Sequence, residues 1–382
     1  MPQFKILPPL SLYIHIPWCV RKCPYCDFNS HVAGEQLAEQ EYVQNLIADL
    51  QQQLPNIWGR RLHSIFIGGG TPSLFSAESI KFLLSQIRML IPSSPDIEIT
   101  MEANPGTFEQ EKFNGFFDAG VNRLSIGIQS FNDSHLKKLG RIHSAQEALQ
   151  AINMAKQAGF KNINLDIMFG LSEQSIQQGV DDLQTAIDNQ PTHISWYQLT
   201  LEANTLFYSQ PPTLPDDENI WQLQQQGQQL LQQHDYQQYE ISAYAKAGKK
   251  CQHNVNYWQF GDYLAIGAGA HGKISRADDN SIGRYSQHRQ PQQYLHHTHK
   301  TSSQHPLDKA DRIYEFMLNA LRLKEGFSVD LFEQHTGLNR ADIQYTCQLA
   351  INKELLCEDG LQLKATTLGY QFLNDLINIF AP

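Results

Sequence analysis

Between Leu12 and about Thr200, short β-rich runs alternate with stretches of helical periodicity, which restricts this part of the chain to parallel strands joined by crossover helices. The six runs are LYIHI (12–16), SIFI (64–67), IEIT (97–100), RLSIGIQ (123–129), INLDIM (163–168) and ISWYQL (194–199). Six strand–helix units predict an α/β fold, an open and incomplete TIM-like (βα)6 barrel. In such a barrel the chemistry is expected at the carboxyl ends of the strands.

Prolines mark the end of this unit. The segment PPTLPDDE (211–218) interrupts both periodicities, and its acidic pair is placed to open the next helix. The glutamine-rich stretch that follows carries apolar residues, including Trp221 and Leu230, at a spacing that favours a polar-faced helix over a low-complexity tract. We therefore expect a barrel unit over 1–210 and an accessory region over 211–304.

A third unit is expected over 305–382. The histidine-rich segment YLHHTHKTSSQH (294–305) predicts a solvated linker, to which we assign no chemistry. Beyond it, DRIYEFMLNALRL predicts an amphipathic helix and ELLCEDGLQLK (354–364) predicts a strand pair, together typical of a small winged-helix-like domain. From Pro306 onward there are seven basic and eleven acidic residues, about −4 in total, which disfavours DNA binding and favours a scaffolding or docking role.

Charge and composition exclude several classes of protein. The net charge of −10 repels a phosphate backbone, so no nucleic-acid partner is expected. No apolar run is long enough to span a bilayer, and the start MPQFKILPPLSLYIHI places prolines where a signal peptide has a continuous apolar stretch, so we expect a cytoplasmic protein. Six cysteines are too few for a disulfide scaffold, and three of them fall within eight residues. That clustering indicates a metal site in a reducing compartment.

The cysteine triplet follows the first predicted strand in PWCVRKCPYCDF, as Cys19, Cys23 and Cys26. Ferredoxin patterns saturate every iron with four cysteines, and zinc knuckles use two ligand pairs. A compact triplet therefore predicts an iron–sulfur cubane with one iron open to a non-protein ligand, which in radical enzymes is S-adenosylmethionine (SAM). The alternatives are three structural cysteines or a zinc site completed by His15 or His31.

Glycines and single polar residues follow the later predicted strands. The run GGGTP (68–72) lets a ligand approach the backbone, and it lacks the lysine of a phosphate-binding loop, although a plain tight turn is the alternative. The polar residues are Glu102, Gln129, Arg141 and Asp166. Each alone is typical of a structural hydrogen-bonding group. At the rim of one barrel, they are suited to the ammonium, carboxylate and ribose hydroxyls of SAM.

Eight strings are spread over residues 13–258: YIHIPWC, KCPYCDFNSH, IFIGGGTPS, MEANPG, GIQS, LGRIH, LDIMFGL and HNVNYW. They closely resemble the oxygen-independent coproporphyrinogen III oxidase-like family of radical SAM proteins, and within it the heme-chaperone group. The resemblance implies a [4Fe–4S] cluster on Cys19, Cys23 and Cys26. It implies that SAM is surrounded by Tyr13, Tyr25, Gly69, Gly70, Thr71, Glu102, Gln129, Arg141 and Asp166.

Two departures disfavour the decarboxylase of that family. The oxidase resembles C-x-x-x-C-x-x-C-x-C, whereas here Phe28 stands two residues after Cys26. The oxidase also has a longer N-terminal extension, whereas Tyr13 lies almost at the start of this sequence. Enzymatic activity therefore stays an open question.

The string HNVNYW resembles a motif linked to heme in the chaperone group. It implies His253 as a ligand of heme iron, with Tyr257 and Trp258 against the macrocycle, while an axial, covalent or merely buried Cys251 is the alternative. The expected function is a heme chaperone that delivers heme to acceptor heme proteins and uses an electron donor to reduce its cluster. A coproporphyrinogen III oxidase, another radical SAM enzyme of tetrapyrroles and a purely structural iron–sulfur protein are the alternatives.

Overall fold

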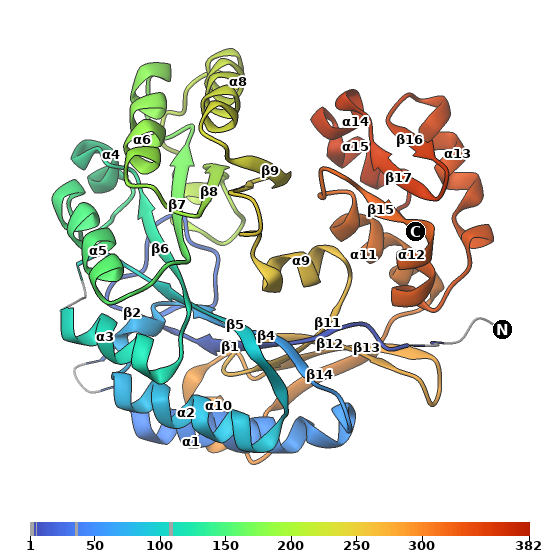
Figure 1. Ribbon diagram of the computed structural model, residues 1–382, viewed down its shortest axis with the longest axis horizontal. Helices are drawn as coiled ribbons and strands as arrows, with labels where there is room; N and C mark the ends of the chain where they lie inside the picture. The colour runs from blue at the N-terminus through green and yellow to red at the C-terminus, as the bar shows by residue number, and fades with distance from the viewer. Residues whose placement is uncertain (1–3, 5, 35–36, 107–109) are drawn as a thin grey trace.

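The computed structural model describes residues 4, 6–34, 37–106 and 110–382. Within these residues a 12-stranded sheet runs through the larger part of the molecule, and it curls into an open barrel (Figure 1). Its strands lie in the order β14 (Thr301–Pro306), β13 (Ser281–Gln287), β12 (His271–Arg276), β11 (Asp262–Ile266), β1 (Leu10–Ile16), β4 (Leu62–Gly69), β5 (Ser93–Ala103), β6 (Arg123–Gln129), β7 (Ile163–Phe169), β8 (His193–Gln198), β10 (Ala243–Ala245) and β9 (Gln237–Glu240).

The six predicted strands form the centre of this sheet. They are β1 and β4 to β8, and each pairs in parallel with the next along the chain. Their side chains are buried on both faces, as in β6, where all seven residues are buried. Parallel strands covered on both sides have this nearly continuous apolar character. The predicted incomplete (βα)6 barrel is confirmed.

Helices cover the outer face of the barrel (Figure 1). They are α1 (Glu39–Gln53), α2 (Ala77–Leu90), α3 (Gln110–Ala119), α5 (Ala145–Gln157), α6 (Ile176–Asp188) and α8 (Asp217–Gln233). Local sequence fixes where several begin: Ser144 and Glu147 form a reciprocal capping box at α5, and the Asp216 side chain accepts from the Asn219 amide at α8. The glutamine-rich stretch is thus a helix, and its acidic pair opens it, as predicted.

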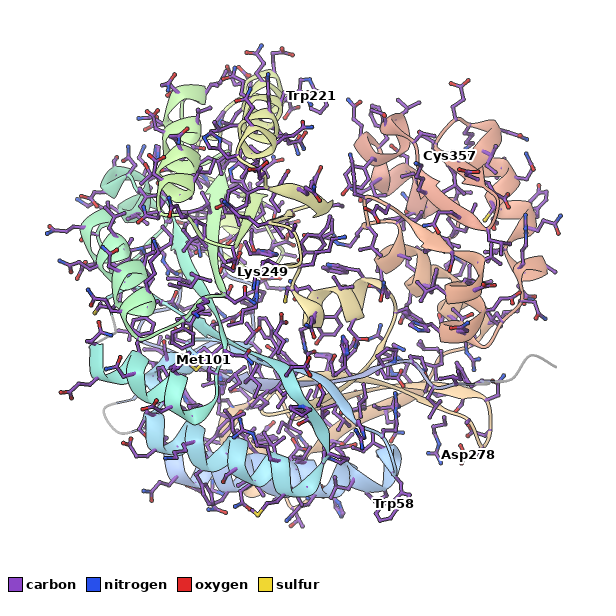
Figure 2. All side chains as sticks on the ribbon, viewed as in Figure 1. Trp58, Met101, Trp221, Lys249, Asp278 and Cys357 are labelled. Carbon is purple, nitrogen blue, oxygen red and sulfur yellow. The ribbon has the colours of Figure 1, made fainter. Side chains whose placement is uncertain are left out.

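The accessory region continues the barrel sheet on both edges. β11 pairs in parallel with β1, and β12 to β14 follow as an antiparallel meander whose β12–β13 turn carries Asp278 (Figure 2). The solvated linker expected over 294–305 was wrong in part, since it holds the end of α10 (Pro291–His296) and the edge strand β14. Lys300 helps to fix the conformation of this segment, because its buried ammonium donates to the carbonyls of Tyr294 and His297, each at 2.7 Å.

The C-terminal residues form a separate lobe (Figure 1), whose hydrophobic core also includes Phe4, Phe260 and Ile282 from earlier in the chain. Its elements are α11 (Lys309–Ala320), β15 (Phe327–Ser328), α12 (Val329–Thr336), α13 (Gln344–Asn352), β16 (Leu356–Asp359), β17 (Gln362–Ala365), α14 (Thr367–Gln371) and α15 (Leu373–Asn378). The predicted amphipathic helix and strand pair are confirmed as α11 and as β16 with β17. A short helix, α9 (Gln252–Trp258), lies between the barrel and this lobe. Within the described residues, no helix is both long and apolar enough to cross a bilayer.

Candidate functional site

The cysteine loop is tied down at both ends. It starts at β2 (Trp18–Cys19), which pairs in parallel with β3 (His31–Val32) after the loop, so the chain closes on itself around the three thiols. The Asn29 side-chain amide then donates to the carbonyls of Ala268 and Arg289, both at 2.9 Å. The loop is therefore fixed to β1 on one side and to the accessory strands on the other.

The three thiols open into a cavity of about 270 Å³ at the carboxyl ends of the central strands. This cavity brings together nearly all the residues that the sequence singled out. Those that line it are Cys19, Cys23, Cys26, Tyr25, Gly69, Gly70, Thr71, Glu102, Gln129, Arg141 and Asp166. Tyr13 lines the adjoining cavity instead, and His253 lines neither.

Arg141 is the cation closest to the thiols. Its Nη1 lies 3.7 Å from Cys23 Sγ, while its Nη2 donates to Asn104 Oδ1 at 2.5 Å and to the Gly127 carbonyl at 2.7 Å. Its Nε is buried and has no hydrogen-bond partner among the described residues. Lys22, within the cysteine loop, donates to the carbonyls of Phe28 and Ser30. A buried guanidinium with an unused donor is suited to a carboxylate ligand.

The donor set fits an iron–sulfur cubane. Among the described residues, no three His, Cys, Asp or Glu side chains converge as a single metal ion requires. Three thiolates of a cubane bind three different irons and need not converge on one point. His15 is also committed elsewhere, with Nδ1 2.9 Å from the Tyr13 hydroxyl and Nε2 2.9 Å from the Asn29 carbonyl.

The remaining cysteines lie outside this cavity. Cys251 and Cys347 are buried in the protein, and Cys357 lies on β16 in the C-terminal lobe (Figure 2).

The glycine run packs the end of β4 against β2. A Cβ on Gly70 would lie 2.5 Å from the Trp18 carbonyl oxygen, and the Gly70 amide donates to the Ile16 carbonyl at 2.7 Å. Gly69 has φ +112°, a conformation that other residues rarely adopt. The run is therefore required by the close approach of two backbones, and the Gly69 amide, 2.9 Å from Glu102 Oε2, orients the carboxylate beside it.

Two carboxyl groups, those of Glu102 and Asp166, line the cavity and interact electrostatically. Burial, followed by the negative charge of the nearby Asp166, raises the pKa of Glu102 to about 8. The hydrogen bond from the Gly69 amide lowers this pKa, but by less. Burial also raises the pKa of Asp166, although its oxygens accept from Ser125 Oγ at 3.0 Å and Asn164 Nδ2 at 2.8 Å. Two buried carboxyls in one cavity favour a cationic ligand, because a cation stabilises their ionised forms.

Sequence analysis missed several polar residues of this cavity, among them Asn104, Ser125 and Tyr197. Asn104 donates to Thr71 Oγ1 at 2.8 Å and so connects Arg141 to the glycine run. The Tyr197 hydroxyl donates to Gln129 Oε1 at 2.7 Å, and Gln129 itself has φ 70°. Asn104 had a detectable signal, since it stands two residues after Glu102 at the same strand end. Ser125 and Tyr197 lie inside apolar runs and had none.

The HNVNYW helix lies behind the barrel wall rather than in the thiol cavity. His253 is 1% exposed, its Nδ1 lies 3.0 Å from Ser64 Oγ, and its Nε2 has no partner among the described residues. Burial lowers the pKa of His253 to about 3. The Trp258 ring packs against the Arg322 guanidinium, 4.3 Å from the ring centroid, which connects this helix to the C-terminal lobe. His253 as a heme ligand stays a prediction.

Known proteins with similar sequences identify the family. Residues 13–186 match the radical SAM superfamily. The chain is 52% identical over 378 residues to the heme chaperone HemW of Haemophilus influenzae, covering 98% of both chains, and 48% identical over 374 residues to HemW of Escherichia coli, again covering 98% of both. The chain belongs to the HemW family. As members of the radical SAM superfamily, proteins of this kind are expected to hold a [4Fe–4S] cluster and SAM.

The fold of this HemW family member is shared with an oxidase. The structure matches coproporphyrinogen III oxidase (HemN) from Escherichia coli, a radical SAM enzyme, with a TM-score of 0.81 over 98% of this chain and 90% of that one. Their sequences are 22% identical, so this likeness shows the fold alone. Residues 307–372 match the HemN C-terminal domain, which coincides with the separate lobe.

Proposed function

We propose that this protein is a heme chaperone that binds one heme and passes it to acceptor heme proteins. Its full-length likeness to proteins named heme chaperone HemW carries the proposal. Phe28 supports it against the oxidase, because an exposed phenylalanine stands where the oxidase pattern has a fourth cysteine. The same residue lines both cavities, so its side chain lies where the thiol cavity and the larger cavity adjoin.

In this proposal Cys19, Cys23 and Cys26 hold the [4Fe–4S] cluster, which supplies single electrons when an external donor reduces it. SAM occupies the 270 Å³ cavity beside it. Glu102 is the partner of the ammonium group, the unused Nε of Arg141 is the donor for the carboxylate, and Asp166 accepts from ribose hydroxyls. The Arg141 guanidinium also offsets the negative charge of the Cys23 thiolate.

The test compares heme carriage with porphyrin chemistry in one preparation. Anaerobically reconstituted protein is titrated with hemin, and the loaded protein is then mixed with a heme-free hemoprotein in the presence of excess apomyoglobin as a trap. We expect saturable binding of one hemin per chain and transfer to the acceptor faster than loss to the trap. Transfer no faster than that loss contradicts the proposal.

A second incubation uses SAM, a reductant and coproporphyrinogen III. We expect no repeated formation of protoporphyrinogen. Multiple turnovers would make the protein an oxidase despite Phe28.

A further inference from the structure

A second, larger cavity adjoins the SAM cavity. It encloses about 800 Å³, which is within the range of pockets that hold large cofactors, and it shares Phe28, Gly69 and Glu102 with the smaller one. One wall is aromatic: the rings of Tyr257 and Tyr263 meet edge to face with centroids 4.3 Å apart, and both line the cavity. A flat apolar ligand with a polar edge fits such a wall.

One accessible imidazole lines this cavity. Among its described lining residues the histidines are His15 and His271, and His15 is 5% exposed with both ring nitrogens engaged. His271 is exposed at the start of β12, and neither of its ring nitrogens has a hydrogen-bond partner among the described residues. Partial burial, followed by the charges of Arg284 and Arg289, lowers the pKa of His271, so its ring is neutral at pH 7. A neutral imidazole with an unshared electron pair is the form that ligates iron.

The backbone beside His271 leaves room for a planar ligand. The preceding residues Gly269 and Ala270 also line the cavity and are both small. Gly269 has φ +77°, and a Cβ there would lie 2.3 Å from Asn29 Nδ2, so this turn is held close to the residue that follows the cysteine loop. The wall carrying His271 is thereby fixed to the cluster loop.

A cationic side chain lines the same cavity as the aromatic wall. Arg289 lines the cavity and is exposed, and its Nε lies 3.4 Å from Asn29 Oδ1, which leaves its terminal amines available to a carboxylate. Arg284, by contrast, is committed to Glu315 and to the Tyr263 hydroxyl. An imidazole, an aromatic wall and an arginine together match the iron, the macrocycle and the propionates of heme.

We propose, building on the chaperone function above, that the 800 Å³ cavity is the binding site of the heme that the chaperone carries. His271 is an axial ligand of its iron, and Arg289 is the partner of a propionate. The iron ligand then lies in the wall of the cavity that adjoins the SAM cavity. The HNVNYW helix contributes Tyr257 to the same cavity. His253, behind that wall, supports the tyrosine, since the two rings meet at 4.8 Å in an edge-to-face contact.

The test is the axial-ligand spectrum of the hemin complex in the full-length, cluster-loaded protein. Hemin difference absorbance and electron paramagnetic resonance are compared for the wild type, His271→Ala, His253→Ala and His234→Ala, the last removing an exposed imidazole at the end of α8. We expect that only His271→Ala loses the histidine-ligated spectrum, and that this variant binds hemin about tenfold more weakly or worse. Added imidazole should restore the spectrum of this variant.

The outcomes separate this inference from the function on which it rests. A folded His271→Ala variant with the wild-type spectrum and affinity would overturn the inference and leave heme carriage standing. A folded His253→Ala variant that alone loses the ligated spectrum would likewise overturn it and assign the ligand to the HNVNYW helix. A wild type that binds no hemin saturably would overturn both.

Discussion

Glu102 makes the affinity for SAM depend on pH. With a pKa of about 8, this buried carboxyl is about one-eleventh ionised at pH 7 in the free protein. A docked ammonium favours the ionised form and lowers this pKa in the complex. Binding therefore releases a proton, and the affinity rises with pH until it levels off near pH 8.

The size of the effect follows from the ionised fraction. Between pH 6 and pH 7 this fraction rises from about 1 in 100 to about 1 in 11, so the affinity should increase about ninefold. The amino group of SAM stays mostly charged over this interval, because an α-amino group has a pKa of about 7.7–8.0. Calorimetric titrations in two buffers of different ionisation enthalpy should show roughly 0.8 proton released per SAM bound at pH 7, which is the proton lost by Glu102 less the small amount taken up by the amino group.

Two variants isolate the carboxyl. Glu102→Gln should bind SAM more weakly and lose this pH dependence, since no proton remains to be released. Asp166→Asn should lower the pKa of Glu102, because it removes the neighbouring negative charge, and should move the levelling-off point below pH 8. A wild-type Kd that is constant between pH 6 and pH 7, with no proton released, would refute the reasoning.

Cys23→Ala should lose most of its iron and its cluster absorbance, whereas Cys357→Ala, in the other lobe, should keep both in an iron and sulfide assay. Gly70→Ala places a Cβ 2.5 Å from the Trp18 carbonyl oxygen in β2, so the iron content and the SAM affinity should fall. Gly34→Ala is the control, because a Cβ there meets no atom within 4 Å and both properties should be unchanged. Asn256→Ala removes two buried hydrogen bonds of 2.9 Å and should lower the free energy of unfolding by about 2–4 kcal/mol in urea titrations; a loss below about 0.5 kcal/mol would contradict this.

The central strands were predictable because each is a short apolar run bounded by turn residues. What the sequence did not indicate is which runs become neighbours. β11 pairs with β1, although about 250 residues separate them, and only the closed fold brings the two together. The edge strand β14, TSSQHP, has no alternation of apolar and polar residues, so its pairing with β13 could not be predicted from a side-chain pattern.

The thiol cavity was predictable to the extent that its residues stand in distinctive strings. Cysteine spacing and the glycine run mark one strand end each, and parallel strands bring all such ends to one rim. His271 has no comparable signal, because it is a single histidine among glycines and alanines in GAGAHG. Its significance comes from lining a cavity whose other walls are contributed by the cysteine loop and α9, which sequence order separates widely.

The HNVNYW helix shows why a motif linked to a ligand need not contain the residue that binds it. Asn256 donates to Ser11 Oγ and to the Asp262 carbonyl and so anchors the helix to β1 and β11. Tyr257 faces the large cavity, and Trp258 packs on Arg322 of the C-terminal lobe. A substitution at His253 would therefore move the aromatic wall and weaken heme binding even without ligating iron. Affinity alone does not identify the ligand, whereas the axial-ligand spectrum does, because loss of an iron-bound imidazole removes the histidine-ligated signature itself.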